Sequence, residues 1–94
     1  MSISVKAVGG TIVEYKNGAF VKSYGSGIVM ATTDGNLVVG VTRSGAVHEF
    51  RAGAFQRSYA TRATVAYVSG DSVHIATREG KMQEYKNGTF RREY

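Results

Sequence analysis

Residues 45–59 read GAVHEFRAGAFQRSY, and close copies of this stretch occur twice more in the chain. Residues 10–24 read GTIVEYKNGAFVKSY, and residues 80–94 read GKMQEYKNGTFRREY. The starts of the three copies differ by 45 − 10 = 35 and by 80 − 45 = 35 residues. Self-similarity at a fixed period is the signature of a repeat architecture, so a unit of 35 residues organises the fold.

The repeated unit is longer than this stretch. Residues 36–43 (NLVVGVTR) align with residues 71–78 (DSVHIATR), and residues 28–33 (IVMATT) align with residues 63–68 (ATVAYV). Residues 2–8 (SISVKAV) lie one period before residues 37–43 and keep the alternation of apolar residues more weakly. Each unit therefore holds four short segments, of which the first unit lacks one.

The segments have the composition of β-strands separated by tight turns. They are rich in Val, Ile, Tyr, Phe and Thr, which fit a pleated, half-buried surface. Asn17-Gly18 and Asn87-Gly88 are strong hairpin signals, whereas Ala52-Gly53 keeps only the glycine and predicts a less well specified turn. Segments joined by two or three residues must be antiparallel neighbours, because a parallel pair needs a crossover of about a dozen residues. We expect no helix, and eleven strands at about 2–8, 11–16, 19–24, 28–33, 37–43, 46–51, 54–59, 63–68, 72–78, 81–86 and 89–94.

A four-stranded antiparallel meander repeated at a fixed period resembles the blade of a β-propeller. The resemblance implies one all-β repeat domain over residues 1–94, with an incomplete blade at 1–24 and complete blades at 27–59 and 63–94. Propellers have about four to eight blades, so three cannot close a ring. We therefore expect a homodimer that forms one six-bladed ring. The alternative is a monomer with internal three-fold symmetry, similar to a β-prism or a β-trefoil.

The repeated aromatic residues are candidates both for packing and for binding. With a two-residue turn at Asn17-Gly18, Tyr15 faces Phe20 and Val13 faces Lys22, and period-two alternation places Tyr15, Phe20 and Tyr24 on one face. We interpret these residues and their copies as pairs that fill the space between blades. The alternative is a stacking platform for a sugar or a base, which makes Tyr24 and Tyr59 candidate ligand-binding residues.

Charged residues recur with the same period. Glu14, Glu49 and Glu84 are each followed two residues later by a cation, which predicts a cross-strand or same-face ion pair in the outer part of each blade, contributing little if it is exposed. The alternative is a carboxylate array for catalysis or for a metal. Lys22, Arg57 and Arg92 fall on the last strand of each unit, where charge discourages edge-to-edge pairing.

Arg43, Arg62 and Arg78 fall in turns and links that would share one rim of a propeller. Such rims commonly hold ligands, and a cluster of guanidinium groups suits phosphate or carboxylate groups. We therefore predict a ligand-binding cluster of Arg43, Arg62 and Arg78. The alternative is that these are solvated loop charges.

Composition limits the chemistry further. The chain has 94 residues, 12 Lys and Arg against 7 Asp and Glu, a net charge of +5, and no cysteine, which excludes disulfides and thiolate sites. No apolar run of about 18 residues predicts a membrane span, and no secretory signal precedes the repeats, so we expect a cytoplasmic protein without a membrane partner. Zinc-protease, phosphate-loop and nucleophile-elbow motifs are absent, and we expect no catalytic residues, metal or cofactor.

These observations favour a non-enzymatic binding or interaction module, either lectin-like or protein-binding. Its expected partners are a second copy of the chain and an unidentified small ligand, glycan or protein. The alternative is a nucleic-acid-binding protein that uses its basic surface and interleaved aromatic residues. An enzyme with a site formed only where two subunits meet is the third hypothesis.

Overall fold

The computed structural model describes residues 3–70 and 72–94, and over these residues the chain is all β, with eleven strands. The strands are β1 (Ser4–Val8), β2 (Thr11–Lys16), β3 (Ala19–Tyr24), β4 (Ile28–Thr33), β5 (Leu37–Thr42), β6 (Val47–Arg51), β7 (Ala54–Tyr59), β8 (Ala63–Ser69), β9 (Ser72–Thr77), β10 (Met82–Lys86) and β11 (Thr89–Glu93). From β2 onward their ends lie within one residue of the predicted ends. The predicted strand start at Ser2, and Asp71 of the predicted turn before β9, lie outside the described residues.

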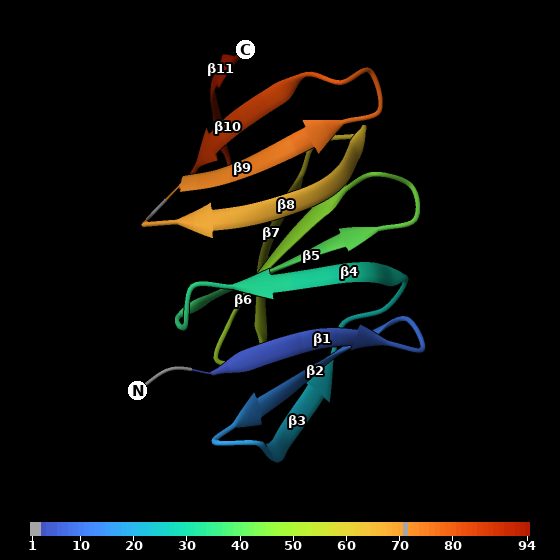
Figure 1. The fold of residues 1–94 in the computed structure, drawn as a ribbon, viewed down its shortest axis with the longest axis vertical. Helices are drawn as coiled ribbons and strands as arrows, with labels where there is room; N and C mark the ends of the chain where they lie inside the picture. Colours follow the sequence, from blue (N-terminus) through green and yellow to red (C-terminus); the bar gives the residue numbers. More distant parts are fainter. Residues whose placement is uncertain (1–2, 71) are drawn as a thin grey trace.

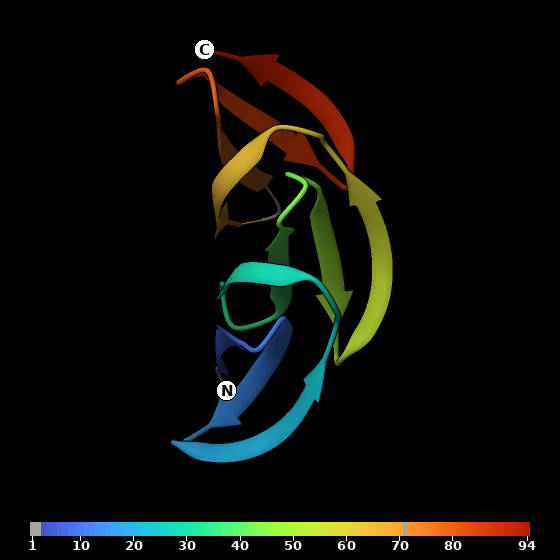
Figure 2. The same ribbon diagram turned by 90° about the vertical axis from the view of Figure 1, so that its right-hand side faces the viewer.

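The strands form three antiparallel sheets, and each sheet is a meander, as the repeat predicts. Sheet I has the order β1-β2-β3, sheet II β4-β5-β6-β7, and sheet III β8-β9-β10-β11. The three sheets follow one another along the long axis of the molecule (Figure 1). In Figure 2 the last strands of the sheets, β3, β7 and β11, curve along one side, while β1, β4 and β8 lie on the opposite side. The part of the chain that the structure describes contains no helix that could cross a membrane.

The outer hairpins turn on two residues with positive φ. Asn17 and Gly18 have φ of 54° and 78°, and Asn87 and Gly88 have 53° and 78°. Two consecutive positive φ angles are the requirement of a type I′ turn, which asparagine and glycine meet readily. Ala52 adopts the same conformation, with φ 53°, although its β-carbon makes it costly.

The core lies between the sheets rather than within one of them. Ile12 of sheet I packs with Ile28, Val38 and Phe50 of sheet II. Sheets II and III enclose a second cluster, which consists of Leu37, Val39, Val41, Val47, Ala63, Ala66, Val73 and Ile75. Sheet II is therefore buried on both faces, which explains why every residue from Leu37 to Val41 is buried in β5.

The first unit is shifted by one residue from the predicted alignment. Val5 pairs with Glu14, whereas period 35 would pair Ser4 with Glu14, as Val39 pairs with Glu49. The cause is the β1–β2 turn, in which only Gly9 and Gly10 separate the strands. A shift of one residue exchanges the two faces of a strand. It aligns Ile3, Val5 and Ala7 with Leu37, Val39 and Val41, and these three residues pack against the sheet I–II cluster.

A β-bulge overturns the predicted faces of the outer hairpin. The register is Tyr15 with Phe20 but Glu14 with Lys22, so the predicted pairing of Val13 with Lys22 is wrong. Because Glu14 and Tyr15 point to opposite faces, Tyr24 shares the face of Glu14 and not that of Phe20. The same irregularity occurs after Glu49 and after Glu84. Strands β3 and β7 therefore each present a tyrosine, Tyr24 or Tyr59, toward the following sheet, and their phenylalanines point to the opposite face.

Candidate functional site

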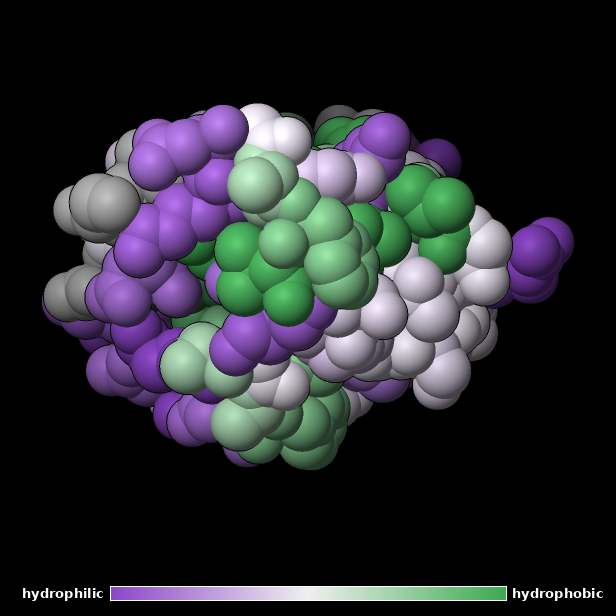
Figure 3. Space-filling model, turned by 90° about the horizontal axis from the view of Figure 1, so that it is seen from below, coloured by the Kyte–Doolittle hydropathy of each residue, from purple (hydrophilic) through white to green (hydrophobic). Residues whose placement is uncertain are grey.

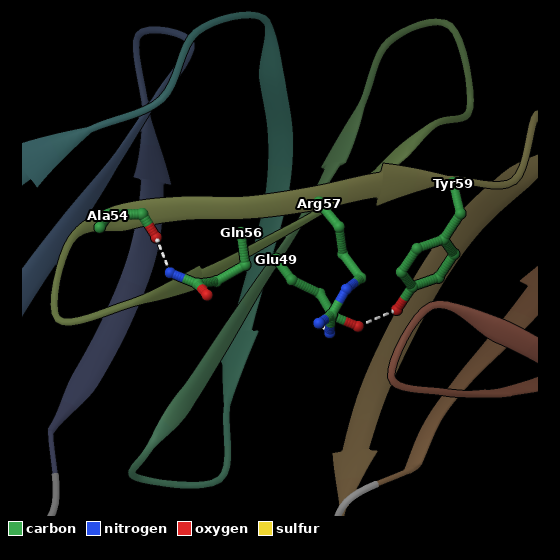
Figure 4. Close-up of polar contacts among 5 residues, drawn as sticks. All are labelled: Glu49, Ala54, Gln56, Arg57 and Tyr59. Atoms are coloured by element: carbon green, nitrogen blue, oxygen red, sulfur yellow. Dashed lines mark hydrogen bonds and ion pairs between the residues drawn. The ribbon is translucent and has the colours of Figure 1, made fainter.

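Three polar side chains of sheet II meet between β6 and β7 (Figure 4). Glu49 is only 1% exposed. Arg57 Nη1 donates a hydrogen bond to Glu49 Oε1 at 2.8 Å, and the Tyr59 hydroxyl donates to Glu49 Oε2. The bulge makes this arrangement possible, because it pairs Glu49 with Arg57 across the strands. The predicted cross-strand ion pair is present here, but Glu49 is buried, because sheet III covers this face of sheet II.

The glutamates of sheets I and III that correspond to Glu49 have different hydrogen-bond partners. In sheet I the Tyr24 hydroxyl donates to Glu14 Oε1 at 2.7 Å, and Glu14 is 6% exposed. In sheet III Glu84 instead pairs with Arg92 Nε at 3.1 Å and accepts the Ser72 hydroxyl at 3.1 Å. No following sheet covers Glu84 within the described chain, and its side chain is correspondingly more exposed.

Each of these tyrosines also packs on the next sheet. The rings of Tyr24 and Phe50 are 5.1 Å apart between centroids, and those of Tyr59 and Tyr85 are 4.6 Å apart and stacked. Burial, and then the hydrogen bond to Glu49, raise the pKa of Tyr59 far above its ordinary value. The same two causes, with Glu14 as the acceptor, raise the pKa of Tyr24. Both hydroxyls therefore stay protonated and act as donors.

The candidate ligand residues Tyr24 and Tyr59 thus lie between sheets. Their hydroxyls bond buried carboxylates and their rings contact the neighbouring sheet, which is the packing arrangement expected for them from the sequence. The binding interpretation of these two tyrosines stays a prediction.

The cation of each outer strand also reaches the next sheet. Lys22 Nζ donates to the Ala52 carbonyl at 3.0 Å. A β-carbon on Gly53 would lie 2.9 Å from Lys22 Cδ, and one on Gly88 would lie 2.5 Å from Arg57 Cδ. Lys22 and Arg57 therefore each lie over the glycine turn of the following sheet.

The three candidate rim arginines lie where links between sheets meet the turns. The Arg43 amide donates to the Gly27 carbonyl at 3.2 Å, and the Arg78 amide donates to the Arg62 carbonyl at 3.0 Å. Arg62 and Arg78 are thus neighbours through their backbones, while Arg43 lies beside the preceding link. The Arg62 side chain is bound to Glu79 at 2.5 Å. The ligand-binding role of Arg43, Arg62 and Arg78 stays a prediction, with one of the three guanidinium groups already paired.

Sequence reasoning missed a row of exposed aromatic residues. Phe20, Phe55 and Phe90 lie on β3, β7 and β11 and are 64%, 56% and 50% exposed. The next cross-strand pair of each hairpin carries one cation, Lys16, Arg51 or Lys86, at the same end of the hairpin but on the opposite face of the sheet from the phenylalanine. We call these six residues the aromatic–basic strip. The exposure of these rings depends on the bulge, which turns the phenylalanines away from the tyrosines and has no clear signal in the sequence.

A protein-family model described as Helicobacter pylori IceA2 protein matches the chain over residues 1–59 and again over residues 44–94. The two matches together span the whole chain. The chain belongs to the IceA2 family. The two matches overlap in residues 44–59, which contain the hairpin with Glu49, Arg57 and Tyr59. The IceA2 family model therefore matches this chain twice, as expected for a chain with internal repeats. No curated protein matched the sequence.

The two histidines of this IceA2-family chain each pack against an aromatic ring. His48 packs edge-on against Phe55 with ring centroids 5.5 Å apart, and His74 stacks on Tyr67 at 4.9 Å. Residues 3–70 and 72–94 contain no group of three or more His, Asp or Glu residues that could hold a metal ion. The buried glutamate and tyrosine contacts described above are suited to packing between sheets, and the exposed aromatic–basic strip is suited to surface binding.

Proposed function

We propose that this chain is a non-enzymatic binding module that holds an anionic protein segment along its aromatic–basic strip. The observation that carries the proposal is the exposure of one phenylalanine ring at the same place in each repeat, at Phe20, Phe55 and Phe90. Exposed apolar residues that recur in register are a signature of interaction surfaces. Burying a phenylalanine on binding would contribute about 1.5–3 kcal/mol.

Repetition would raise the affinity further. Three equivalent weak contacts on one rigid scaffold bind a repeated partner with avidity, because the second and third contacts are intramolecular. One cation in the cross-strand pair next to each ring, from Lys16, Arg51 and Lys86, adds positive charge at the same end of each hairpin and favours a partner that carries carboxylates.

The test removes the rings one at a time. An acidic peptide with regularly spaced aromatic residues is titrated against Phe20→Ser, Phe55→Ser, Phe90→Ser and the triple variant. We expect each single change to weaken binding by about tenfold, which corresponds to about 1.4 kcal/mol. Val29→Ser is the matched control, because Val29 is 50% exposed but lies on β4 outside the strip. Unchanged binding by the triple variant would overturn the proposal.

Nucleic acid is the second candidate partner, favoured by the net charge of +5. Two of the cations near the strip are neutralised, because Arg57 pairs with Glu49 and Arg92 pairs with Glu84. This pairing favours a protein partner over a polyanion. Single-stranded DNA and a glycan array are therefore included in the binding test. Affinity for DNA that falls steeply with salt would support the nucleic-acid alternative, and selective binding on the array would support a lectin-like role.

We further propose that the three sheets are blades of a propeller-like ring that two chains complete. The support is their sequential stacking, with β3, β7 and β11 along one side (Figure 2). Two chains would supply six blades, within the usual range of about four to eight. Light scattering tests this arrangement, since a chain of 10.1 kDa that stays monomeric at every concentration would exclude it.

A further inference from the structure

The contact between neighbouring sheets is built twice from equivalent parts. Tyr24 of sheet I lies on Phe50 of sheet II, and Tyr59 of sheet II lies on Tyr85 of sheet III. In both contacts the outer-strand cation, Lys22 or Arg57, covers the glycine of the next hairpin turn. In each contact the outer strand of one sheet contributes a tyrosine and a cation. The following sheet contributes an aromatic ring and a hairpin turn.

Each end of the molecule carries the residues of one side of this contact, without a partner sheet in the described chain. At the end formed by sheet III, Tyr94 is 59% exposed and the Arg92 side chain is 66% exposed. At the end formed by sheet I, a β-carbon on Gly18 would have no neighbour within 4 Å, unlike one on Gly53 or Gly88. Tyr15, which corresponds to Phe50 and Tyr85, faces this same end beside Phe20 and under the ammonium group of Lys6.

Exposed apolar surface is concentrated at these ends. Among residues 3–70 and 72–94, nine large apolar residues are exposed, and five of them lie on the two end faces, which are Val8 and Phe20 on sheet I and Val65, Tyr67 and Tyr94 on sheet III. Figure 3 looks at the molecule from the sheet I end and shows apolar atoms exposed in the middle of that face. Such surface is unusual on an end that remains in water.

We infer that the sheet III end of one copy docks on the sheet I end of another, with Tyr94 against Tyr15 and Arg92 over the Asn17-Gly18 turn. The occupant is a second copy, because the contact continues one already present twice in the chain. The inference rests on the proposed two-chain ring and names the surfaces that join it. In such a ring both junctions are of this head-to-tail kind.

The inner halves of the ends make this contact weaker than the internal ones. Ser4 and Lys6 stand where sheet II has Val38 and Gly40, as their pairing with β2 shows. His74 on the opposite end stands where sheet II has the buried Val39. Less apolar area is therefore available near β1 and β9, and the association depends on the outer strands and on concentration.

Single cysteines test the geometry directly, because the chain has none of its own. Tyr15→Cys and Tyr94→Cys are prepared separately, mixed, and treated with a short thiol-specific cross-linker. We expect a cross-linked 1:1 dimer in the mixture and almost none with either variant alone, because head-to-tail contact never brings identical positions together. Phe55→Cys mixed with Tyr94→Cys is the control, since Phe55 is exposed but lies on neither end.

Oligomeric state provides the second measurement. Tyr15→Asp and Tyr94→Asp should each shift the chain to monomer in sedimentation, and their mixture should recover a dimer through the one intact junction. A wild-type chain that is monomeric at all concentrations overturns both the ring and this contact, and leaves binding through the aromatic–basic strip unaffected. A dimer that both variants leave intact, or cross-linking between identical positions, overturns the contact alone.

Discussion

The side chain of Ile28 covers Gly40, and a β-carbon on Gly40 would lie 2.9 Å from Ile28 Cδ1. Both residues belong to sheet II, on strands β4 and β5. In sheet III the corresponding residues are Ala63 and Ile75, so the small and the large residue have changed places. The two units fill equivalent space with opposite distributions of volume, as close packing requires.

This relationship predicts strong coupling between the two positions. Gly40→Ala alone should lower the free energy of unfolding by about 1–3 kcal/mol, because it overpacks the contact with Ile28. Combining it with Ile28→Ala should cost clearly less than the sum of the two single changes, since the large residue is then gone. Urea denaturation of the two single variants and the double variant measures the coupling, and strictly additive costs would contradict this account.

The glutamates of the three units should differ in their contribution to stability. Glu49→Ala removes the acceptor of Tyr59 and Arg57 in a buried place and should destabilise the fold by about 2–3 kcal/mol. Glu84→Ala is the matched control, because its partner Arg92 is mostly exposed, and we expect a loss of less than about 1 kcal/mol. Equal losses in chemical denaturation would show that burial of Glu49 is not what matters.

The turn at Ala52 offers a stabilising change. Ala52→Asn should raise the free energy of unfolding by about 0.5–1 kcal/mol, since asparagine accepts the positive φ that alanine adopts there at a cost. The reverse change, Asn17→Ala, should lower it by a similar amount in the same conformation. Thermal unfolding of both variants checks the pair, and a destabilised Ala52→Asn would mean that the Ala52 side chain has a packing role.

Stability should fall as the pH rises above about 10. Tyr24 and Tyr59 have folded-state pKa values raised above the ordinary 10.0. Above that pH the unfolded chain loses these protons while the folded chain keeps them, so the free energy of unfolding decreases as the pH rises. Denaturation at increasing pH should show the fall, and it should be shallower in Tyr59→Phe. A flat profile above pH 10 would contradict the burial of these hydroxyls.

Most of the fold could be predicted because it depends on local signals. The 35-residue period, the alternating segments and the Asn-Gly turns are sufficient to place the strands and their order within each sheet. The shift of β1 also had a signal, since Ile3, Val5 and Ala7 match Leu37, Val39 and Val41 once the Gly9-Gly10 turn is taken as one residue shorter. The β-bulge had none that was comparable, because its extra residue is Val21, Gln56 or Arg91 in the three units.

The candidate site was harder to predict because its character depends on contacts between sheets. Glu49 reads as a solvated charge in the sequence and becomes buried only because sheet III lies over it. The exposure of Phe20, Phe55 and Phe90 depends on the bulge and was missed for that reason. The proximity of Arg62 to Arg78 could be predicted from the meander topology alone, because these residues flank two paired strands. In the structure the Arg78 amide donates a hydrogen bond to the Arg62 carbonyl.

The bulge in each outer strand has a mechanical consequence. Tyr59 of strand β7 stacks on Tyr85 of sheet III, while Phe55 packs on Phe50 of its own sheet, whose ring contacts Tyr24 of sheet I, so this short strand is linked to both neighbouring sheets. A shift of β7 that disrupts the contact of sheet II with one neighbouring sheet would therefore also disturb its contact with the other. We therefore expect the three units to unfold cooperatively in a single transition, and not one after another from an end.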